Sequence, residues 1–277
     1  MTAQAFKLGK LPAQHDARTV HLEDVLDRPL LPEPAPVADW GVKLPEDVGM
    51  MKNDEAGDCT IAGAGHAIQL WTGNNGQIVT LSDDIVIETY KTLTKLANGR
   101  PYDPNDPSTD TGLVLLDVLK YWRSTGIGGH KIGGFVKVNH RDIRELRIAL
   151  QLFGGLYTGV ELPQISMNEI GKVWDHTDGP IAGGHCMTAH AAHAETAKEI
   201  VHDIAAEAAA STAAEAKAAQ VGMSFFTWGR RQPATWRWAT ACMDEAYAII
   251  SEDWVSGAKP APSGFDIDKL RRYLAAL

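Results

Sequence analysis

The stretch Gly57-Asp58-Cys59-Thr60-Ile61-Ala62-Gly63-Ala64-Gly65 joins a polar turn to a run of small and apolar residues. Residues 60–71 contain neither proline nor a long polar run, so we expect a helix that packs closely through its small residues. Cys59 then stands at the helix N-terminus, where unpaired N–H groups and a partial positive charge lower the pKa of a thiol. This position is typical of a cysteine nucleophile, although many free cysteines are simply small buried hydrophobes.

Composition narrows the class of protein. The chain has 277 residues, 44 % of them hydrophobic, and a net charge of −9, which suits a globular protein and argues against binding to a nucleic acid backbone. The first 20 residues lack the pattern of a secretory signal, and no apolar run is long enough to span a membrane. The odd set of three cysteines, without a CxxC pair, suggests no disulfide framework. We therefore expect a protein of bacterial or phage type, cytoplasmic or virion-associated, with neither membrane nor nucleic acid as a partner.

Local patterns divide the chain into an arm and one mixed domain. Residues 1–38 are rich in proline and polar groups and are expected to form an extended N-terminal arm, ahead of a domain over 39–277. Its α-rich half, about 50–130, is expected to contain helices at 59–71, 83–96 and 113–124. Its β-rich half, about 131–277, is expected to contain strands near 135–138, 155–162, 181–189, 223–229 and 246–250, with a helix over 142–153.

An alanine-rich stretch over about 194–222 interrupts the β-rich half. Alanine has the highest helix propensity, so this stretch is expected to be a helical insertion. After residue 204 it offers little apolar surface to bury, which favours a helix that projects from the domain. It is either a simple decoration, a lid, or a docking segment for a protein partner.

The chain also pairs a thiol with a distant histidine. His185 lies on an apolar strand of the second half, and an imidazole there can take the proton of Cys59 and later deliver it to a leaving group. Taken alone, His185 is more often a core histidine, so the joint placement of the two residues carries the hypothesis.

Metal binding is the main rival interpretation of the histidines. On a strand, His185 and His193 face one side while Cys186 and His190 face the other, so they do not readily share a zinc ion. The acidic loop carrying Asp103, Asp106 and Asp110 lacks the spacing of an EF-hand and is more typical of a solvated turn. We expect no metal and no cofactor.

Six motifs follow one another in a characteristic order. They are Asp39-Trp40 with Val48-Gly49-Met50-Met51-Lys52-Asn53; Gly57-Asp58-Cys59-Thr60-Ile61-Ala62; Asp110-Thr111-Gly112; residues 146–150 through 154–160; Gly184-His185-Cys186-Met187; and Thr227-Trp228-Gly229. This order resembles the papain superfamily of cysteine peptidases over about residues 39–253. The resemblance implies an α+β fold, in which an α-rich half and an antiparallel β-barrel-like half enclose a substrate cleft.

The resemblance also implies roles for individual residues. Cys59 would be the nucleophile, His185 the general base and acid, and Asn53, six residues before the thiol, a donor to the oxyanion. Gly112, Asp110 and Trp228 would lie along the substrate cleft, with Trp228 shielding the histidine from solvent.

Three departures from the family pattern matter for function. Phe226 stands where the family has the asparagine that orients the histidine, so that task would fall to a backbone carbonyl, Thr227, Ser224 or water. Thr60 replaces the tryptophan next to the nucleophile, and the upstream disulfide cysteine is absent, consistent with a reducing compartment.

The N-terminal arm is shorter than the family's inhibitory propeptides and has no clear amphipathic helix, so we expect it to dock on the surface or on a neighbour.

These features lead to one function and two alternatives. The first expectation is a papain-like thiol hydrolase, a cysteine peptidase acting on peptide or protein substrates. The alternative, motivated by Phe226 and the alanine-rich stretch, is a catalytically inactive papain-like domain that serves as a binding or structural module in a large assembly such as a phage particle. A thiol amidase or transglutaminase-like enzyme is the weaker third interpretation, because it shares the same Cys–His chemistry.

Overall fold

The computed structural model describes residues 6–25, 33–194 and 221–252. The predicted strands, and the predicted helices outside the alanine-rich stretch, occur with ends displaced by a few residues, and further helices at 22–25, 164–168 and 236–242 and strands at 37–39 and 230–235 occur where none was predicted. Nearly all of the alanine-rich stretch, for which a helical insertion is expected, lies outside the described residues. None of the helices in the described ranges has the length and hydropathy needed to span a membrane.

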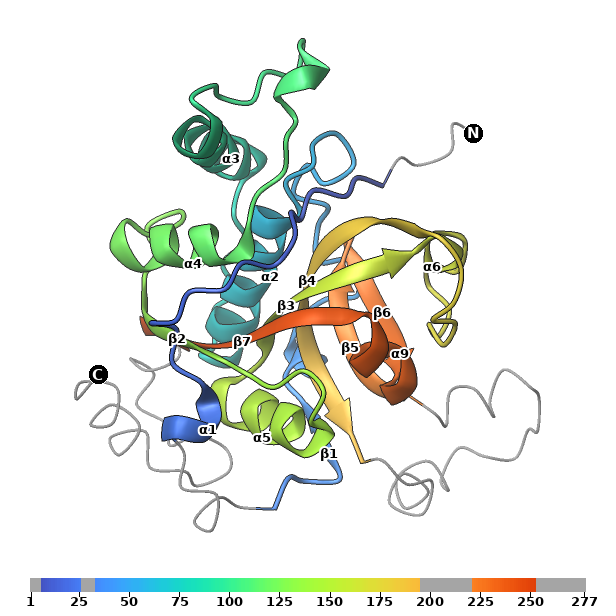
Figure 1. Cartoon of the computed structure of the whole chain (residues 1–277). Coiled ribbons are helices and arrows are strands. Elements are labelled where there is room, and N and C mark those ends of the chain that lie inside the picture. Colours follow the sequence, from blue (N-terminus) through green and yellow to red (C-terminus); the bar gives the residue numbers. More distant parts are fainter. Residues whose placement is uncertain (1–5, 26–32, 195–220, 253–277) are drawn as a thin grey trace.

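An antiparallel sheet forms the β-rich half (Figure 1). Its strands run in the order β2-β7-β3-β4-β5-β6, and β1 pairs with β4 off this path. Their bounds are β1 (Val37–Asp39), β2 (Ile132–Lys137), β3 (Leu156–Pro163), β4 (Ile181–His193), β5 (Val221–Thr227), β6 (Arg230–Thr235) and β7 (Met243–Ser251). The central strand pair β3–β4 is almost entirely buried, which explains its near-continuous run of small and apolar residues.

Helices α2, α3 and α4 gather on one side of this sheet, toward the upper left of Figure 1. The helical elements are α1 (Leu22–Val25), α2 (Cys59–Asn74), α3 (Asp83–Asn98), α4 (Leu115–Ser124), α5 (Ile143–Phe153), α6 (Gln164–Asn168) and α9 (Trp236–Cys242), with 3-10 turns η2 (Gly41–Lys43) and η3 (Pro107–Thr109). The fold is therefore α+β with two unlike halves, as expected.

Two of these helices have ends that the sequence specifies directly. Ser82 and Asp142 accept hydrogen bonds from the third residue after them and so cap the N-termini of α3 and α5. Gly99 and Gly154 end the same helices in the left-handed conformation, which glycine adopts without strain. These caps account for the agreement between the expected and observed limits of both helices.

Close packing sets helix α2 against the middle of the sheet. A Cβ atom at Gly63 would lie 2.9 Å from Cys186 Sγ, and the Thr188 hydroxyl donates to the Gly63 carbonyl at 2.6 Å. Tyr157 of β3 donates its hydroxyl to the Thr60 carbonyl at 2.7 Å. The small residues that follow Cys59 thus allow the start of α2 to approach strands β3 and β4.

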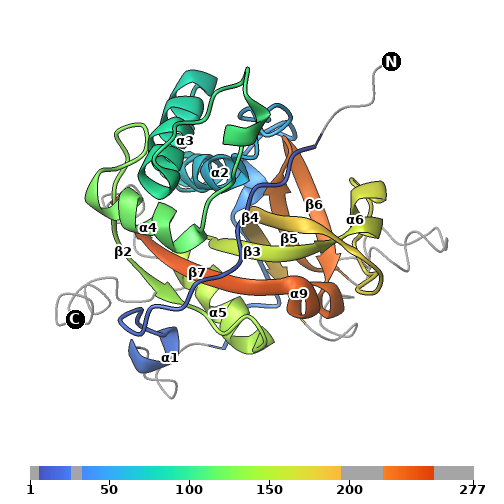
Figure 2. The same ribbon diagram turned by 45° about the horizontal axis from the view of Figure 1, so that its top comes forward.

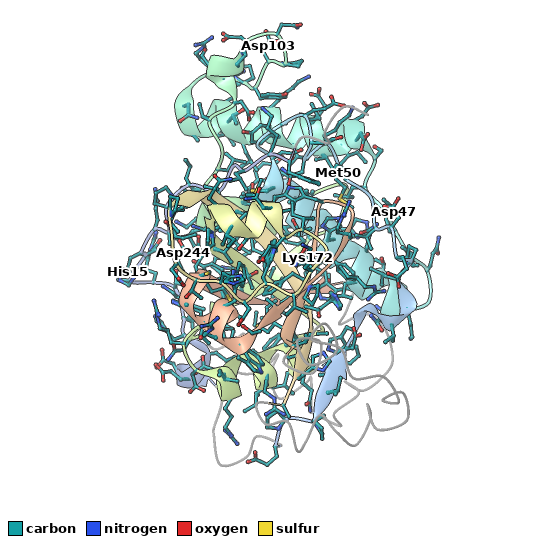
Figure 3. The ribbon with its side chains drawn as sticks, turned by 90° about the vertical axis from the view of Figure 1, so that its right-hand side faces the viewer. His15, Asp47, Met50, Asp103, Lys172 and Asp244 are labelled. Carbon is teal, nitrogen blue, oxygen red and sulfur yellow. The ribbon has the colours of Figure 1, made fainter. Side chains whose placement is uncertain are left out.

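The tip of the acidic loop lies far from this contact. Asp103 is at the outer tip of the α-rich half in Figure 3, well away from Asp244. Asp106 pairs with Arg100 at 2.8 Å, and Asp103 accepts a hydrogen bond from the Asn105 N–H. Within the described residues no group of three or more His, Cys, Asp or Glu is placed to hold a metal ion.

Candidate active site

Cys59 is the first residue of α2 and is almost completely buried, with 1 % of its surface exposed. Burial raises the pKa of the thiol to about 12, although the backbone N–H groups of Cys186 and Gly9 lie against the sulfur and act in the opposite direction. The helix N-terminus alone would favour the thiolate, so desolvation outweighs it in this conformation. In the described conformation, therefore, Cys59 is a protonated thiol at neutral pH.

His185 lies on β4 immediately before Cys186, whose N–H faces the thiol. It is fully buried, and burial lowers its pKa to about 3, so the imidazole is neutral. Its Nδ1 atom has no hydrogen-bond partner among the described residues. A neutral imidazole with one free nitrogen has the protonation state of a general base, but it makes no hydrogen bond with the thiol here.

Thr227 and Trp228 hold the other side of the imidazole. Thr227 Oγ1 lies 2.6 Å from His185 Nε2, and the Trp228 ring stacks on the imidazole with a centroid distance of 4.2 Å. Trp228 and Gly229 form a two-residue hairpin turn between β5 and β6, and both have positive φ, as a type I′ turn requires. This short turn places tryptophan over the histidine at the cost of an uncommon backbone conformation for a large residue.

The histidine is therefore oriented by Thr227, one of the four alternatives left open by the sequence. Phe226 packs on the opposite side of β5, where it stacks on His190 at 4.1 Å and joins a separate apolar cluster with Leu44 and Leu70. Successive strand residues face opposite sides, so residues 226 and 227 cannot both reach His185. The alternation of side chains along β5 was the signal that could have identified Thr227.

Asn53 contacts the turn that precedes Cys59, but its amide is already engaged. Its Nδ2 group donates to the Ala56 carbonyl and to Asp58 Oδ1, both at 3.2 Å. An oxyanion role for this side chain requires one of these hydrogen bonds to be exchanged. The backbone N–H at the start of α2 is the other donor available at this position.

Asp110 supports the turn before the thiol. Its carboxylate accepts hydrogen bonds from the Gly57 N–H and from the Tyr90 hydroxyl, and that hydroxyl accepts from the Gly112 N–H. The network connects the loop of residues 98–112 to the nucleophile segment. Asp110 and Gly112 thus both bind the Tyr90 hydroxyl, and Asp110 in addition holds the main chain at Gly57.

Comparison with solved structures identifies this architecture. Xylellain, a cysteine protease from Xylella fastidiosa, superposes with a TM-score of 0.59 over 90 % of this chain and 98 % of that one, at 13 % identity. The fold is papain-like. ProCathepsin B S9 from Trypanosoma congolense (TM-score 0.55, 11 % identity, 89 % and 87 % covered) and the ragweed pollen protease Amb a 11 in its proform (0.52, 13 %, 82 % and 67 %) also match. No family model matches the sequence, and no curated protein resembles it significantly.

Residues 6–11, which we call the strap, cross the papain-like fold between its two halves. Figure 2 shows this blue segment passing between helices α2 and α4 on one side and strands β3 and β7 on the other. On the α-rich side, Leu113 donates its N–H to the Gly9 carbonyl at 2.8 Å and accepts from the Leu11 N–H at 2.9 Å. On the β-rich side, the Lys10 N–H donates to the Gly184 carbonyl at 3.1 Å. Of the strap residues only Lys10 is buried, and the Gly9 N–H lies against Cys59 Sγ, so this part of the arm docks on its own domain along the line where the two halves meet.

Glycines on both sides make room for the strap. A Cβ at Gly112 would lie 2.3 Å from the Gly9 carbonyl oxygen, and one at Gly184 would lie 2.3 Å from that of Lys10. Gly9 itself would place a Cβ 1.7 Å from the Gly57 carbonyl oxygen. Since real Cβ contacts of this length do not occur, glycine is required on both sides of the strap. This main-chain fit needs no amphipathic helix, which explains why the sequence pattern did not indicate it.

Proposed function

We propose that the protein is a thiol peptidase whose Cys59–His185 site is closed by its own strap in the described conformation. The observation that carries the proposal is that an extended peptide backbone already lies over Cys59, hydrogen-bonded to Leu113 on one side and to Gly184 on the other. A site that binds main-chain groups in this way suits a peptide substrate, because every peptide offers the same groups. The papain-like fold and the cysteine proteases that share it support the same reaction class.

The chemistry follows from the groups around the thiol. Once the strap leaves, water and the α2 N-terminus lower the pKa of Cys59, and the free Nδ1 of His185 takes its proton. The thiolate attacks the substrate carbonyl carbon, the backbone N–H of Cys59 stabilises the oxyanion, and His185 gives the proton to the leaving amine as the C–N bond breaks. Water, deprotonated by His185, then attacks the thioester, which breaks the C–S bond, releases the carboxylic acid product and returns the Cys59 thiol. Thr227 orients the imidazole, and Trp228 keeps solvent from it.

The strap itself escapes this reaction because of what it presents to the sulfur. The strap group that lies against Cys59 Sγ is the N–H of Gly9, which is a hydrogen-bond donor and not an electrophile. The strap therefore covers the thiol with a hydrogen-bond donor.

The test uses the full chain with Lys10→Glu, which places a carboxylate beside Asp244 and Glu245 and should expel the strap. We expect this variant to cleave a mixed peptide library, detected by mass spectrometry, while the parent chain cleaves it about 100-fold more slowly. Adding Cys59→Ala or His185→Ala should abolish cleavage, whereas Cys242→Ala should not.

The rival function is a papain-like module that binds but does not catalyse. Two observations favour it: Thr227 offers a hydroxyl where an amide would fix the tautomer more firmly, and the Asn53 amide is engaged elsewhere. A folded Lys10→Glu variant that cleaves nothing in the library, with Cys59 no more reactive toward iodoacetamide than Cys242, would decide for this rival.

A further inference from the structure

The side chain of Lys10 is fully buried and ends beside two carboxylates, that of Glu245, which is fully buried, and that of Asp244, whose side chain is 24 % exposed. Its Nζ atom donates to Asp244 Oδ2 at 2.6 Å and lies 3.6 Å from Glu245 Oε1, and none of its side-chain surface is exposed. By contrast, Lys7 of the same strap is 46 % exposed and comes no closer than 4.0 Å to Asp110. Two carboxylates thus hold Lys10, whereas Lys7 is exposed and has only a long contact with Asp110.

The sheet register explains why this acidic site exists beside the candidate nucleophile. Gly159 of β3 pairs with Cys186 on one side and with Glu245 on the other, so the three residues form one row across β4, β3 and β7. Directly paired residues point to the same face of a sheet, so Glu245 faces the same side as Cys186, whose N–H lies against Cys59 Sγ. The acidic site and the thiol therefore belong to one continuous surface under the strap.

Gly159 provides the path into the site. A Cβ at this position would lie 2.3 Å from Lys10 Cε and 2.8 Å from Glu245 Cγ. Any larger residue would close the space through which the aliphatic stem of Lys10 passes. We define the Lys10 site as Gly159, Asp244 and Glu245.

The charge of this site is not balanced by the domain itself. Glu245 is fully buried, and its Oε1 atom has no hydrogen bond within the described residues, while the Tyr247 hydroxyl donates to Oε2 at 3.0 Å. Burial raises the pKa of Glu245, and the charge of Lys10 is the largest influence in the opposite direction, ahead of the Tyr247 hydrogen bond and the charge of Lys137. A buried carboxylate is costly unless a cation is supplied, and here the cation comes from a segment that covers the site.

We propose that the Lys10 site is a specificity site that takes the lysine or arginine side chain of a peptide ligand, and that Lys10 is its internal occupant. This inference rests on the proposed peptidase function, and it names the substrate class: peptides with a cationic side chain at this position. A neutral side chain would leave the two carboxylates without this cation, and an acidic side chain would add a third carboxylate. The preference for cationic side chains therefore comes mainly from the unfavourable binding free energy of neutral and acidic ones.

A binding experiment tests the site without requiring catalysis. The full chain carrying Lys10→Glu and Cys59→Ala is mixed with a fluorescent peptide of residues 6–13, Phe-Lys-Leu-Gly-Lys-Leu-Pro-Ala, and affinity is read from anisotropy. Replacing the second lysine of this peptide by leucine should weaken binding about tenfold or more, whereas replacing the first, which matches exposed Lys7, should change it less than about twofold. Adding Glu245→Gln to the protein should reduce the discrimination to about threefold or less.

The variant Lys10→Leu, with circular dichroism to confirm folding, serves as a second open form in case Lys10→Glu does not fold. Equal losses from the two lysine replacements, or discrimination that Glu245→Gln leaves unchanged, would overturn the inference. So would a folded open form that binds neither the parent peptide nor its variants.

Measuring peptide hydrolysis distinguishes the proposed lysine specificity from the proposed peptidase function. With Cys59 restored, the open chain should cleave peptides that carry lysine or arginine at the recognised position about tenfold faster than their leucine counterparts. Cleavage without this preference contradicts the Lys10 site and leaves the peptidase function intact. Lysine-dependent binding without any Cys59-dependent cleavage supports the site and contradicts the peptidase function.

Discussion

The strap and strand β1 come from the same N-terminal region but join the fold in different ways. Strand β1 extends the sheet: its residues pair with Ala191, Ala192 and His193 of β4, and Asp39 Oδ1 lies 3.0 Å from His190 Nδ1. The strap instead lies between the two halves, covers Cys59, and buries the charge of Lys10 against two carboxylates. Strand β1 is thus part of the scaffold, while the strap occupies a place that a second peptide could take.

The largest expected effect distinguishes these two attachments directly. In Lys10→Glu, the rate of iodoacetamide modification at Cys59 should rise about 100-fold at neutral pH, because exposure returns the thiol pKa from about 12 toward its ordinary range. The modification is followed by peptide mass spectrometry, with Cys186 and Cys242 as internal references. Asp39→Asn, which weakens β1, should leave the Cys59 rate within about twofold of the parent. A comparable increase in both variants would mean that the two segments are coupled.

A smaller effect is expected from a single added methyl group in the strap. In Gly9→Ala, the new Cβ would lie 1.7 Å from the Gly57 carbonyl oxygen, so the strap must shift and Cys59 modification should accelerate about tenfold. Gly133→Ala is the matched control, because its Cβ would meet nothing closer than 3.7 Å. Equal rates in the two variants would show that the strap does not depend on the main-chain contact with Gly57.

The hydroxyl of Thr227 should matter only once the strap is open. In the Lys10→Glu background, Thr227→Val keeps the shape of the side chain but removes the partner of His185 Nε2. We expect the Cys59 modification rate to fall about fivefold to tenfold, with Thr227→Ser restoring most of it. The pH profile of this rate is the informative measurement, because loss of orientation shifts the apparent pKa of the pair. An unchanged profile in Thr227→Val would assign the orientation of His185 to another group.

The smallest effect concerns stability near β1. Burial lowers the pKa of His190 below its ordinary value of 6.5, so the folded state keeps the ring neutral while the unfolded state takes up a proton. This contribution to stability is present above pH 6.5 and is lost as the pH falls. His190→Gln should therefore make the acid dependence of the unfolding free energy shallower, by at most about 1.4 kcal/mol per pH unit, measured by urea denaturation. The rate of Cys59 modification by iodoacetamide should not change, which would again show that β1 and the strap are attached to the fold independently.

Local patterns were sufficient for the secondary structure around the candidate site. The small residues after Cys59 indicated a closely packed helix, and the apolar run around His185 indicated a buried strand, because both patterns depend on neighbours within a few residues. They were not sufficient for the partner of His185. Motif spacing placed Phe226 at the family's asparagine position and left the task to a backbone carbonyl, Thr227, Ser224 or water, whereas side-chain alternation along β5 and the two-residue turn at Trp228 bring Thr227 to the imidazole.

The sequence by itself determined the mixed α+β class, the helix that begins at Cys59 and the strand that carries His185, since hydrophobic periodicity and capping residues act locally. Only the tertiary structure decided what covers the thiol and where Lys10 goes. Residues 6–11 have no periodicity that marks them, and their position depends on glycines at 57, 112 and 184 and on carboxylates at 244 and 245. Contacts between residues so distant in the chain are set by the packing of the two halves, which no local pattern encodes.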